Sequence, residues 1–141
     1  MHEDKTVGDV MTSNPTTVQP TASVQEAARC MRDEDVGIVP ITEGDRLVGT
    51  VTDRDIAMRV VAEGKDPQST AVRDIASTDV VTVDPQQDLD EALRLMASNQ
   101  VRRLPVVEED GRLVGVVAQK DVAEEGDDAK TGEVVQEISQ D

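Results

Sequence analysis

An internal repeat constrains this sequence more than any other feature. Residues 7–43 match residues 72–108 at 12 of 37 positions, and residues 44–56 match residues 110–122 at 6 of 13 positions. Both copies contain the segment RLVG, and TVQP in the first copy corresponds to TVDP in the second. A duplicated chain is expected to fold as two similar units, so a prediction made for one copy is checked by the other.

The repeat predicts how the chain is divided. Its length of 141 residues is that of one ordinary domain, so each copy forms half of a single module. The predicted parts are a first repeat at 7–64, a linker at 65–71, a second repeat at 72–125 and an acidic tail at 126–141.

The composition excludes several classes of function. Asp and Glu number 30 against 14 Lys and Arg, the formal net charge is −16, and there is no aromatic residue. Nucleic-acid binding relies on cationic side chains and stacking aromatic rings, so we expect no nucleic-acid partner. Cys30 is the only cysteine and His2 the only histidine. Catalytic triads and Cys or His metal clusters therefore lack their residues, and we predict that the chain is not an enzyme.

The same residues give an expectation for the location of the protein. No apolar run approaches the roughly 18 residues of a membrane span, and the first residues lack the basic start of a signal peptide. We expect a cytoplasmic protein with no membrane partner. The acidic charge favours a halophilic cytosol, where salt screens self-repulsion, and the alternative is an acidic protein of an ordinary cytosol.

Periodicity predicts the same order of elements in both copies. Apolar residues at helical spacing indicate helices that start near Val24 and Leu89. Ser23 with Glu26, and Asp88 with Glu91, have the spacing of a capping box. A β-hairpin follows each helix, and a further helix follows each hairpin. The predicted strands are 37–41, 47–51, 103–107 and 113–117, and the predicted helix after the first hairpin is 53–63.

This duplicated pattern resembles a tandem pair of CBS domains, a Bateman module. The resemblance covers roughly residues 5–125 and rests on TVQP, on VGIVPI and VRRLPVV, and on GTVTDRDI and GVVAQKDV. It implies an α/β fold in which two β-α-β-β-α repeats pack with pseudo-twofold symmetry. It also implies clefts between the repeats that bind an adenosine nucleotide (AMP, ADP or ATP) or S-adenosylmethionine, with Mg²⁺ as an ion that could accompany it.

The resemblance also assigns ligand-binding residues at the start of the last helix of the first repeat. Asp55 would accept the ribose hydroxyls, Thr52 would lie near the phosphate, and Arg54 lies between them in the same motif. A helix N-terminus, hydroxyls and backbone N–H groups are common phosphate ligands. Thr-x-x-Asp is also a capping box that stabilises a helix and binds nothing, and this alternative remains open.

The second repeat has a different set of residues at the same place. Asp121 is retained beside Lys120, but Ala118 replaces the threonine. Arg102 and Arg103 are candidates to bind the phosphates instead, because arginine binds phosphate bidentately. The alternative is that both arginines pair with carboxylates of the chain itself.

The base is expected to lie against strand residues, which are equally suited to core packing. By position, the residues of the Asp121 cleft are Thr16, Val36 and Gly37, and those of the Asp55 cleft are Val81, Val101 and Arg102. Cys30, Met31, Met58 and Met96 are predicted to fill the core.

Three functions follow in order of preference. The first is a regulatory module that binds an adenosine nucleotide and signals to an unknown partner in trans, because 141 residues leave no room for an attached catalytic domain. The second is a structural or assembly module with vestigial clefts, and the third is an enzyme. A homodimer is expected through Ile56, Ala57, Val60 and Val61, although core packing explains these residues equally well.

Overall fold

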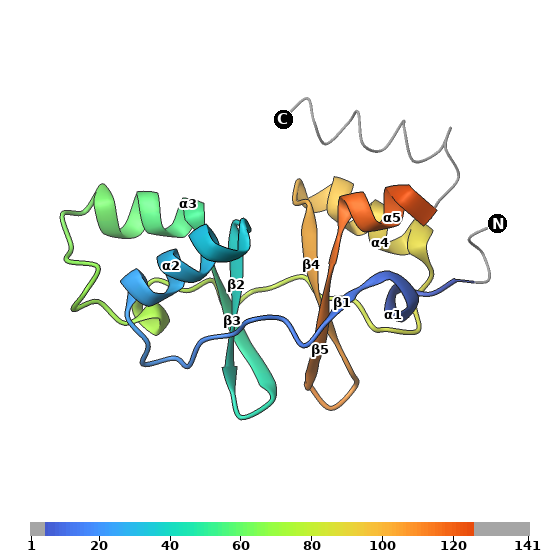
Figure 1. The fold of residues 1–141 in the computed structure, drawn as a ribbon, viewed down its shortest axis with the longest axis horizontal. Helices are drawn as coiled ribbons and strands as arrows, with labels where there is room; N and C mark the ends of the chain where they lie inside the picture. The colour runs from blue at the N-terminus through green and yellow to red at the C-terminus, as the bar shows by residue number, and fades with distance from the viewer. Residues whose placement is uncertain (1–4, 126–141) are drawn as a thin grey trace. The chain divides into compact units, whose positions relative to one another are not determined.

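Residues 5–125 are described in the structure, a computed structural model. The predicted acidic tail lies outside the described residues. Contacts divide the chain into two units, each of which contains helices and strands (Figure 1). The central unit is Thr16–Val80, and the described residues of the flanking unit are 5–15 and 81–125.

The central unit begins with a capped helix. In α2 (Val24–Glu34), the Ser23 Oγ accepts a hydrogen bond from the Glu26 N–H at 3.1 Å. The helix ends at Asp35, whose φ of 56° is in the left-handed region. The hydrogen bond between Ser23 and Glu26 confirms the predicted N-terminus of the helix. Its buried residues, Val24, Ala27 and Met31, have the helical spacing on which the prediction was based.

A hairpin follows α2. Strands β2 (Ile38–Glu43) and β3 (Arg46–Thr52) pair antiparallel, and Gly44 adopts a φ of +65° in the turn between them. Glycine adopts this conformation more readily than a residue with a Cβ atom, so Gly44 favours the turn locally. The core of the unit comprises Val18, Val24, Ala27, Met31, Val39, Ile41, Val51, Val60, Val72 and Ile75.

The next helix changes its hydrogen bonding along its length. It begins as α3 (Asp53–Ile56) and continues as the π-helix η2 (Ala57–Val61). The Ala62 N–H donates to the Ala57 carbonyl, five residues earlier, at 2.9 Å. A short 3₁₀ helix, η3 (Val72–Asp74), lies further along the chain.

The flanking unit combines the start of the chain with the second hairpin. Strand β1 (Thr12–Ser13) joins β4 (Arg103–Val107) and β5 (Leu113–Ala118) in a sheet of order β1-β5-β4, and helix α1 (Val7–Val10) contacts β5. Helices α4 (Leu89–Asn99) and α5 (Gln119–Glu125) complete the unit. Its core comprises Val7, Val83, Leu89, Ala92, Leu93, Met96, Leu104, Val106, Val117 and Val122.

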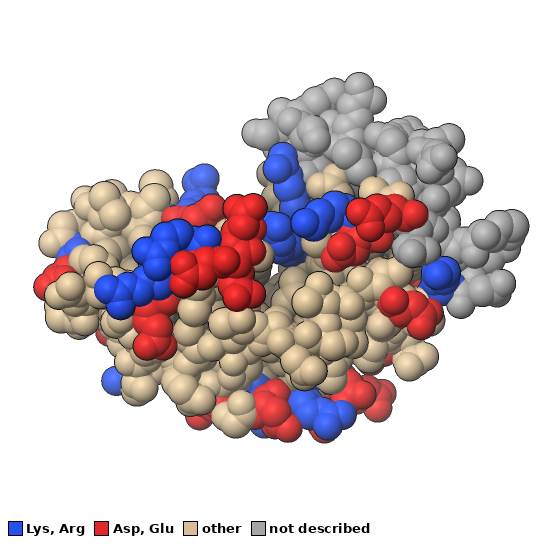
Figure 2. Space-filling model, viewed as in Figure 1, with Lys and Arg blue, Asp and Glu red and all other residues tan. Residues whose placement is uncertain are grey.

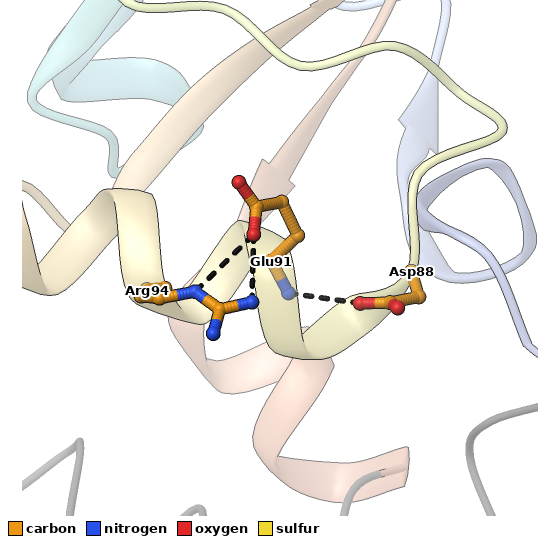
Figure 3. A network of polar contacts seen from close by, with 3 residues as sticks. All are labelled: Asp88, Glu91 and Arg94. Carbon is orange, nitrogen blue, oxygen red and sulfur yellow. Dashed lines mark hydrogen bonds and ion pairs between the residues drawn. The ribbon is translucent and has the colours of Figure 1, made fainter.

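The N-terminus of α4 has one half of the predicted capping box. Asp88 Oδ1 accepts from the Glu91 N–H at 2.9 Å (Figure 3). The Glu91 carboxylate is directed instead to Arg94, whose Nη2 lies 2.7 Å from Glu91 Oε2. The acidic side chain therefore forms an ion pair within the helix.

One feature of the fold was not predicted from the repeat. The segment before the first helix of each repeat pairs with the hairpin of the other repeat. Thr12 pairs with Val116 in the flanking unit, and Ser77 forms an antiparallel bridge with Thr50 in the central unit. The division by packing therefore differs from the division by sequence repeat, and the predicted domain boundaries remain a prediction.

The methionine predictions have mixed outcomes. Met31 and Met96 are buried in the cores, as predicted. The prediction for Met58 was wrong, because 54% of this residue is exposed on the π-helix. Cys30 packs at the edge of the central core and is only partly buried.

Candidate functional site

The first candidate site consists of Thr52, Asp53, Arg54 and Asp55, where β3 ends and α3 begins; we call it the 52–55 site. The Asp55 N–H donates to Thr52 Oγ1 at 3.0 Å, and the Thr52 N–H donates to Asp55 Oδ2 at 3.0 Å. Asp55 is only 8% exposed. The two side chains therefore form the complete capping box that the sequence offered as an alternative to ligand binding.

A third side chain reaches the Asp55 carboxylate. Ser77 Oγ lies 3.4 Å from Oδ1 and 3.4 Å from Oδ2 of Asp55. The sequence analysis missed this residue, which is 22 positions away along the chain. A signal existed, because Ser77 aligns with Thr12 in the repeat and both carry a hydroxyl.

The other residues assigned to the first repeat surround this turn or lie apart from it. The Asp53 N–H donates to the Gly37 carbonyl at 3.0 Å, so Gly37 lies beside the 52–55 site. Val36 is partly buried after α2, whereas Arg54 and Thr16 are exposed. Their predicted contacts with a ligand remain predictions.

The second candidate site consists of Ala118, Gln119, Lys120 and Asp121, and we call it the 118–121 site. The Ala118 N–H donates to Asp121 Oδ2 at 3.3 Å, which is longer than the corresponding bond to Asp55. Ala118 provides no hydroxyl to return the bond. Asp121 is partly exposed and Lys120 is exposed. This carboxylate is therefore less enclosed than Asp55.

The start of β4 and the residue before it bring two arginines to the 118–121 site. Arg103 pairs with Ala118 in the sheet, and the Gln119 N–H donates to the Arg102 carbonyl at 2.8 Å. Arg102 is exposed and Arg103 is partly buried. Residues 102–103 and 118–119, which the prediction assigned to one cleft, are therefore joined by backbone hydrogen bonding.

The charges of these arginines are not neutralised within the described part of the chain. Acidic and basic side chains are intermixed on the face shown in Figure 2. Within residues 5–125, however, neither Arg102 nor Arg103 forms an ion pair. Ion pairs within that range include Arg32 with Asp33, Arg94 with Glu91 and Arg112 with Glu108.

Two further features of the flanking unit bear on the site. Gln119 is buried, and its Nε2 has no hydrogen-bond partner among the described residues. Sequence analysis gave no sign of this unpaired donor. Val81, assigned to bind the base, packs against the core, whereas Val101 is exposed. Val81 is partly buried there, and its predicted contact with the base stays a prediction.

Comparison with known families identifies the module. The family model of the CBS domain matches the chain twice, at residues 7–62 and 72–128. The chain belongs to the CBS domain family. The CBS domain-containing protein YhcV of Bacillus subtilis is 45% identical over 117 residues, which cover 83% of this chain and 82% of YhcV.

Solved CBS structures share the fold. Hypoxic Response Protein I, solved with two coordinated zinc ions, has a TM-score of 0.80 and 37% identity, and the match covers 87% of this chain and 100% of that one. No group of three or more His, Cys, Asp or Glu residues within 5–125 is arranged to hold a metal ion.

Two similar structures contain adenosine compounds. CBSX2 in complex with AMP has a TM-score of 0.74 and 29% identity, with 86% of this chain and 95% of CBSX2 covered. The CBS pair of MJ0100, bound to 5′-methylthioadenosine and S-adenosyl-L-methionine, has a TM-score of 0.75 and 26% identity, with 85% and 94% covered. CBS pairs similar to this chain therefore bind adenosine compounds.

The similarity to an enzyme is confined to the CBS region. Inosine-5′-monophosphate dehydrogenase of Korarchaeum cryptofilum is 42% identical over 106 residues, but these cover only 21% of that protein.

Among residues 5–125, no helix is long and apolar enough to cross a membrane.

Proposed function

We propose that this chain is a regulatory module that binds an adenosine nucleotide and passes the state of its sites to a partner protein in trans. The observation that supports it most is that a carboxylate and cationic side chains come together at the 118–121 site. Asp121 is a partly exposed carboxylate, and the neighbouring Arg102 and Arg103 have no ion pair within residues 5–125. A ribose provides hydroxyl donors and a phosphate provides negative charge, so a nucleotide complements both groups.

The two sites are expected to differ in preference. The 118–121 site combines a carboxylate with cationic side chains, so it favours a ligand with more phosphate groups. The 52–55 site has a hydroxyl, a buried carboxylate and one cationic side chain, Arg54, against three cationic side chains at the other site, so it favours the nucleoside part of the ligand. Mg²⁺ would enter only with the phosphates, as their counter-ion.

A second function, assembly without a ligand, is favoured by one observation. Thr52 and Asp55 satisfy each other in a complete capping box, which stabilises α3 whether or not a ligand binds. In this alternative, the pairing surfaces of a homodimer would be the functional feature.

A thermal-shift panel distinguishes the two functions. The protein is heated in molar KCl, to screen its charge, with AMP, ADP, ATP, S-adenosylmethionine or NAD. An extrinsic dye reports unfolding, because the chain has no aromatic residue. A ligand at about 100 times its Kd adds roughly 2.7 kcal/mol of stability. A rise in Tm with an adenosine compound supports the regulatory module, and no rise with any compound favours assembly.

A further inference from the structure

Ser77 is held against the hairpin of the central unit by its backbone. Its N–H donates to the Thr50 carbonyl and the Thr50 N–H donates to its carbonyl, both at 2.9 Å. Gly49 makes this approach possible, because a Cβ atom there would lie 3.0 Å from the Ser77 carbonyl oxygen. The position of Ser77 is therefore set by the main chain and not by its hydroxyl.

A second contact holds the segment that leads to Ser77. Arg59, on the π-helix η2, donates from Nη1 to the Ile75 carbonyl at 3.0 Å and lies 3.4 Å from the Ala76 carbonyl. Hydrogen bonds from a charged donor are stronger than those between neutral groups. The backbone bonds to Thr50 hold Ser77 itself, and Arg59 holds the two residues before it. These contacts place the Ser77 hydroxyl at Asp55.

The hydroxyl contacts the carboxylate without using up its capacity to accept hydrogen bonds. Both distances, 3.4 Å, exceed the 2.5–3.0 Å typical of O–H···O bonds. The Thr52 N–H is the other donor to this carboxylate within the described residues. A carboxylate accepts about four hydrogen bonds. Asp55 is therefore a buried acceptor with capacity left for another hydroxyl.

The second repeat lacks this arrangement. Thr12 occupies the position equivalent to Ser77, but it is exposed and forms no hydrogen bond to Asp121 within residues 5–125. The contact between the hydroxyl and the carboxylate is therefore particular to the 52–55 site, and so is any selectivity that depends on it.

We propose that Ser77 is a positioning residue that makes the 52–55 site selective for ribose over deoxyribose. This inference rests on the proposed function. The Ser77 hydroxyl has one proton to donate, so it bonds one Asp55 oxygen at a time. Together with the Thr52 N–H it restrains the carboxylate, which keeps acceptor capacity for a ribose hydroxyl. A deoxyribose leaves that buried oxygen without its donor, and an unsatisfied buried acceptor is costly.

The test uses the full chain with Asp121→Asn, which removes the carboxylate of the other site. AMP, 2′-deoxy-AMP and 3′-deoxy-AMP are titrated calorimetrically in molar KCl. The Ser77 parent is expected to prefer AMP over at least one deoxy analogue by about tenfold or more, because the lost hydrogen bond is one to a charged carboxylate. Ser77→Ala should reduce this preference to about threefold or less, and Ser77→Thr should preserve it.

The controls separate a positioning role from a structural one. Ser98→Ala, at an exposed serine on α4, should leave the preference unchanged. If Ser77→Ala does not fold, Ser77→Cys replaces it, because a thiol is a poor donor of similar size. Equal weakening of AMP and both analogues by the Ser77 variants overturns the positioning role alone. Failure of the unmodified chain to bind AMP or any other adenosine compound of the thermal-shift panel overturns the proposed function as well. Binding that is lost with Asp121→Asn alone overturns a ligand role for the 52–55 site.

Discussion

Thr52 and Asp55 each donate a backbone N–H to the other's side chain, at 3.0 Å in both directions. This reciprocal contact fixes the junction of β3 and α3, and it places a buried carboxylate at the end of a strand. The residues that make the helix start well defined are therefore the same residues that we propose as part of the ligand site.

We expect Thr52→Ala to lower the free energy of unfolding by about 1 kcal/mol, because an N-cap side chain is lost. Urea denaturation without ligand measures this effect. Thr21→Ala, at an exposed threonine, is the matched control and should change stability by less than about 0.5 kcal/mol. Equal stability of the Thr52 and Thr21 variants would show that the capping box contributes nothing.

The glycine of each RLVG segment lies against the chain segment that pairs with it. A Cβ at Gly115 would lie 2.8 Å from the Thr12 carbonyl oxygen, and a Cβ at Gly49 would lie 3.0 Å from the Ser77 carbonyl oxygen. Gly115→Ala should therefore destabilise the protein by about 1–3 kcal/mol, and Gly49→Ala by less. Thermal unfolding of the two variants checks the order. A neutral Gly115→Ala would contradict the pairing of β1 with β5.

The repeat explains why the hairpins and first helices could be predicted. Strand β4 has the predicted bounds, 103–107, and the buried face of α2 contains the apolar residues whose spacing indicated it. The spacing of apolar residues and the turn residues determine these elements locally, and both signals occur in each copy of the repeat. The pairing of Thr12 with Val116 is different, because a two-residue strand has no periodicity and its partner is over 100 residues away.

The local contacts of the candidate site were predictable from the sequence, and its long-range contact was not. The Thr52–Asp55 spacing is local and was recognised, whereas Ser77 reaches Asp55 only through the folded path of the segment after η3. Met58 was misplaced because π-helical bonding from Ala57 to Val61 changes the face that each residue presents. Of the predicted dimer residues, Val60 is fully buried and so belongs to the core.

A homodimer remains a prediction. The exposed apolar side chains of η2 are the candidates for its interface. Met58 is 54% exposed and Val61 is 72% exposed on η2. We expect the double variant Met58→Asp, Val61→Asp to be monomeric, because charges in an apolar interface are costly to bury. Light scattering in molar KCl measures the mass. Val48→Asp, at an exposed valine of β3, is the control and should remain dimeric; a monomeric unmodified protein would refute the dimer.

Cys30 should react slowly with alkylating reagents. Partial burial, followed by the negative charges of Glu26, Glu34 and Asp33, raises the pKa of its thiol. A raised pKa means less of the reactive thiolate at a given pH, so the rate with iodoacetamide should still be rising at a pH where that of glutathione has levelled off. Mass spectrometry of samples quenched over a pH series measures the rate. A profile that levels off before that of glutathione would contradict the raised pKa.

The central claim, that a carboxylate and arginines together bind an adenosine nucleotide, is tested most directly by calorimetric titration of ATP and adenosine into the unmodified protein, Arg103→Ala and Asp121→Ala at fixed KCl. We predict that Arg103→Ala weakens ATP binding by about tenfold or more and adenosine binding little, because a charge-assisted bond to phosphate contributes roughly 1.5–3 kcal/mol. Asp121→Ala should weaken both ligands, because both contain the ribose. Equal weakening of ATP and adenosine by Arg103→Ala, or no binding of either ligand by the unmodified protein, would contradict the account.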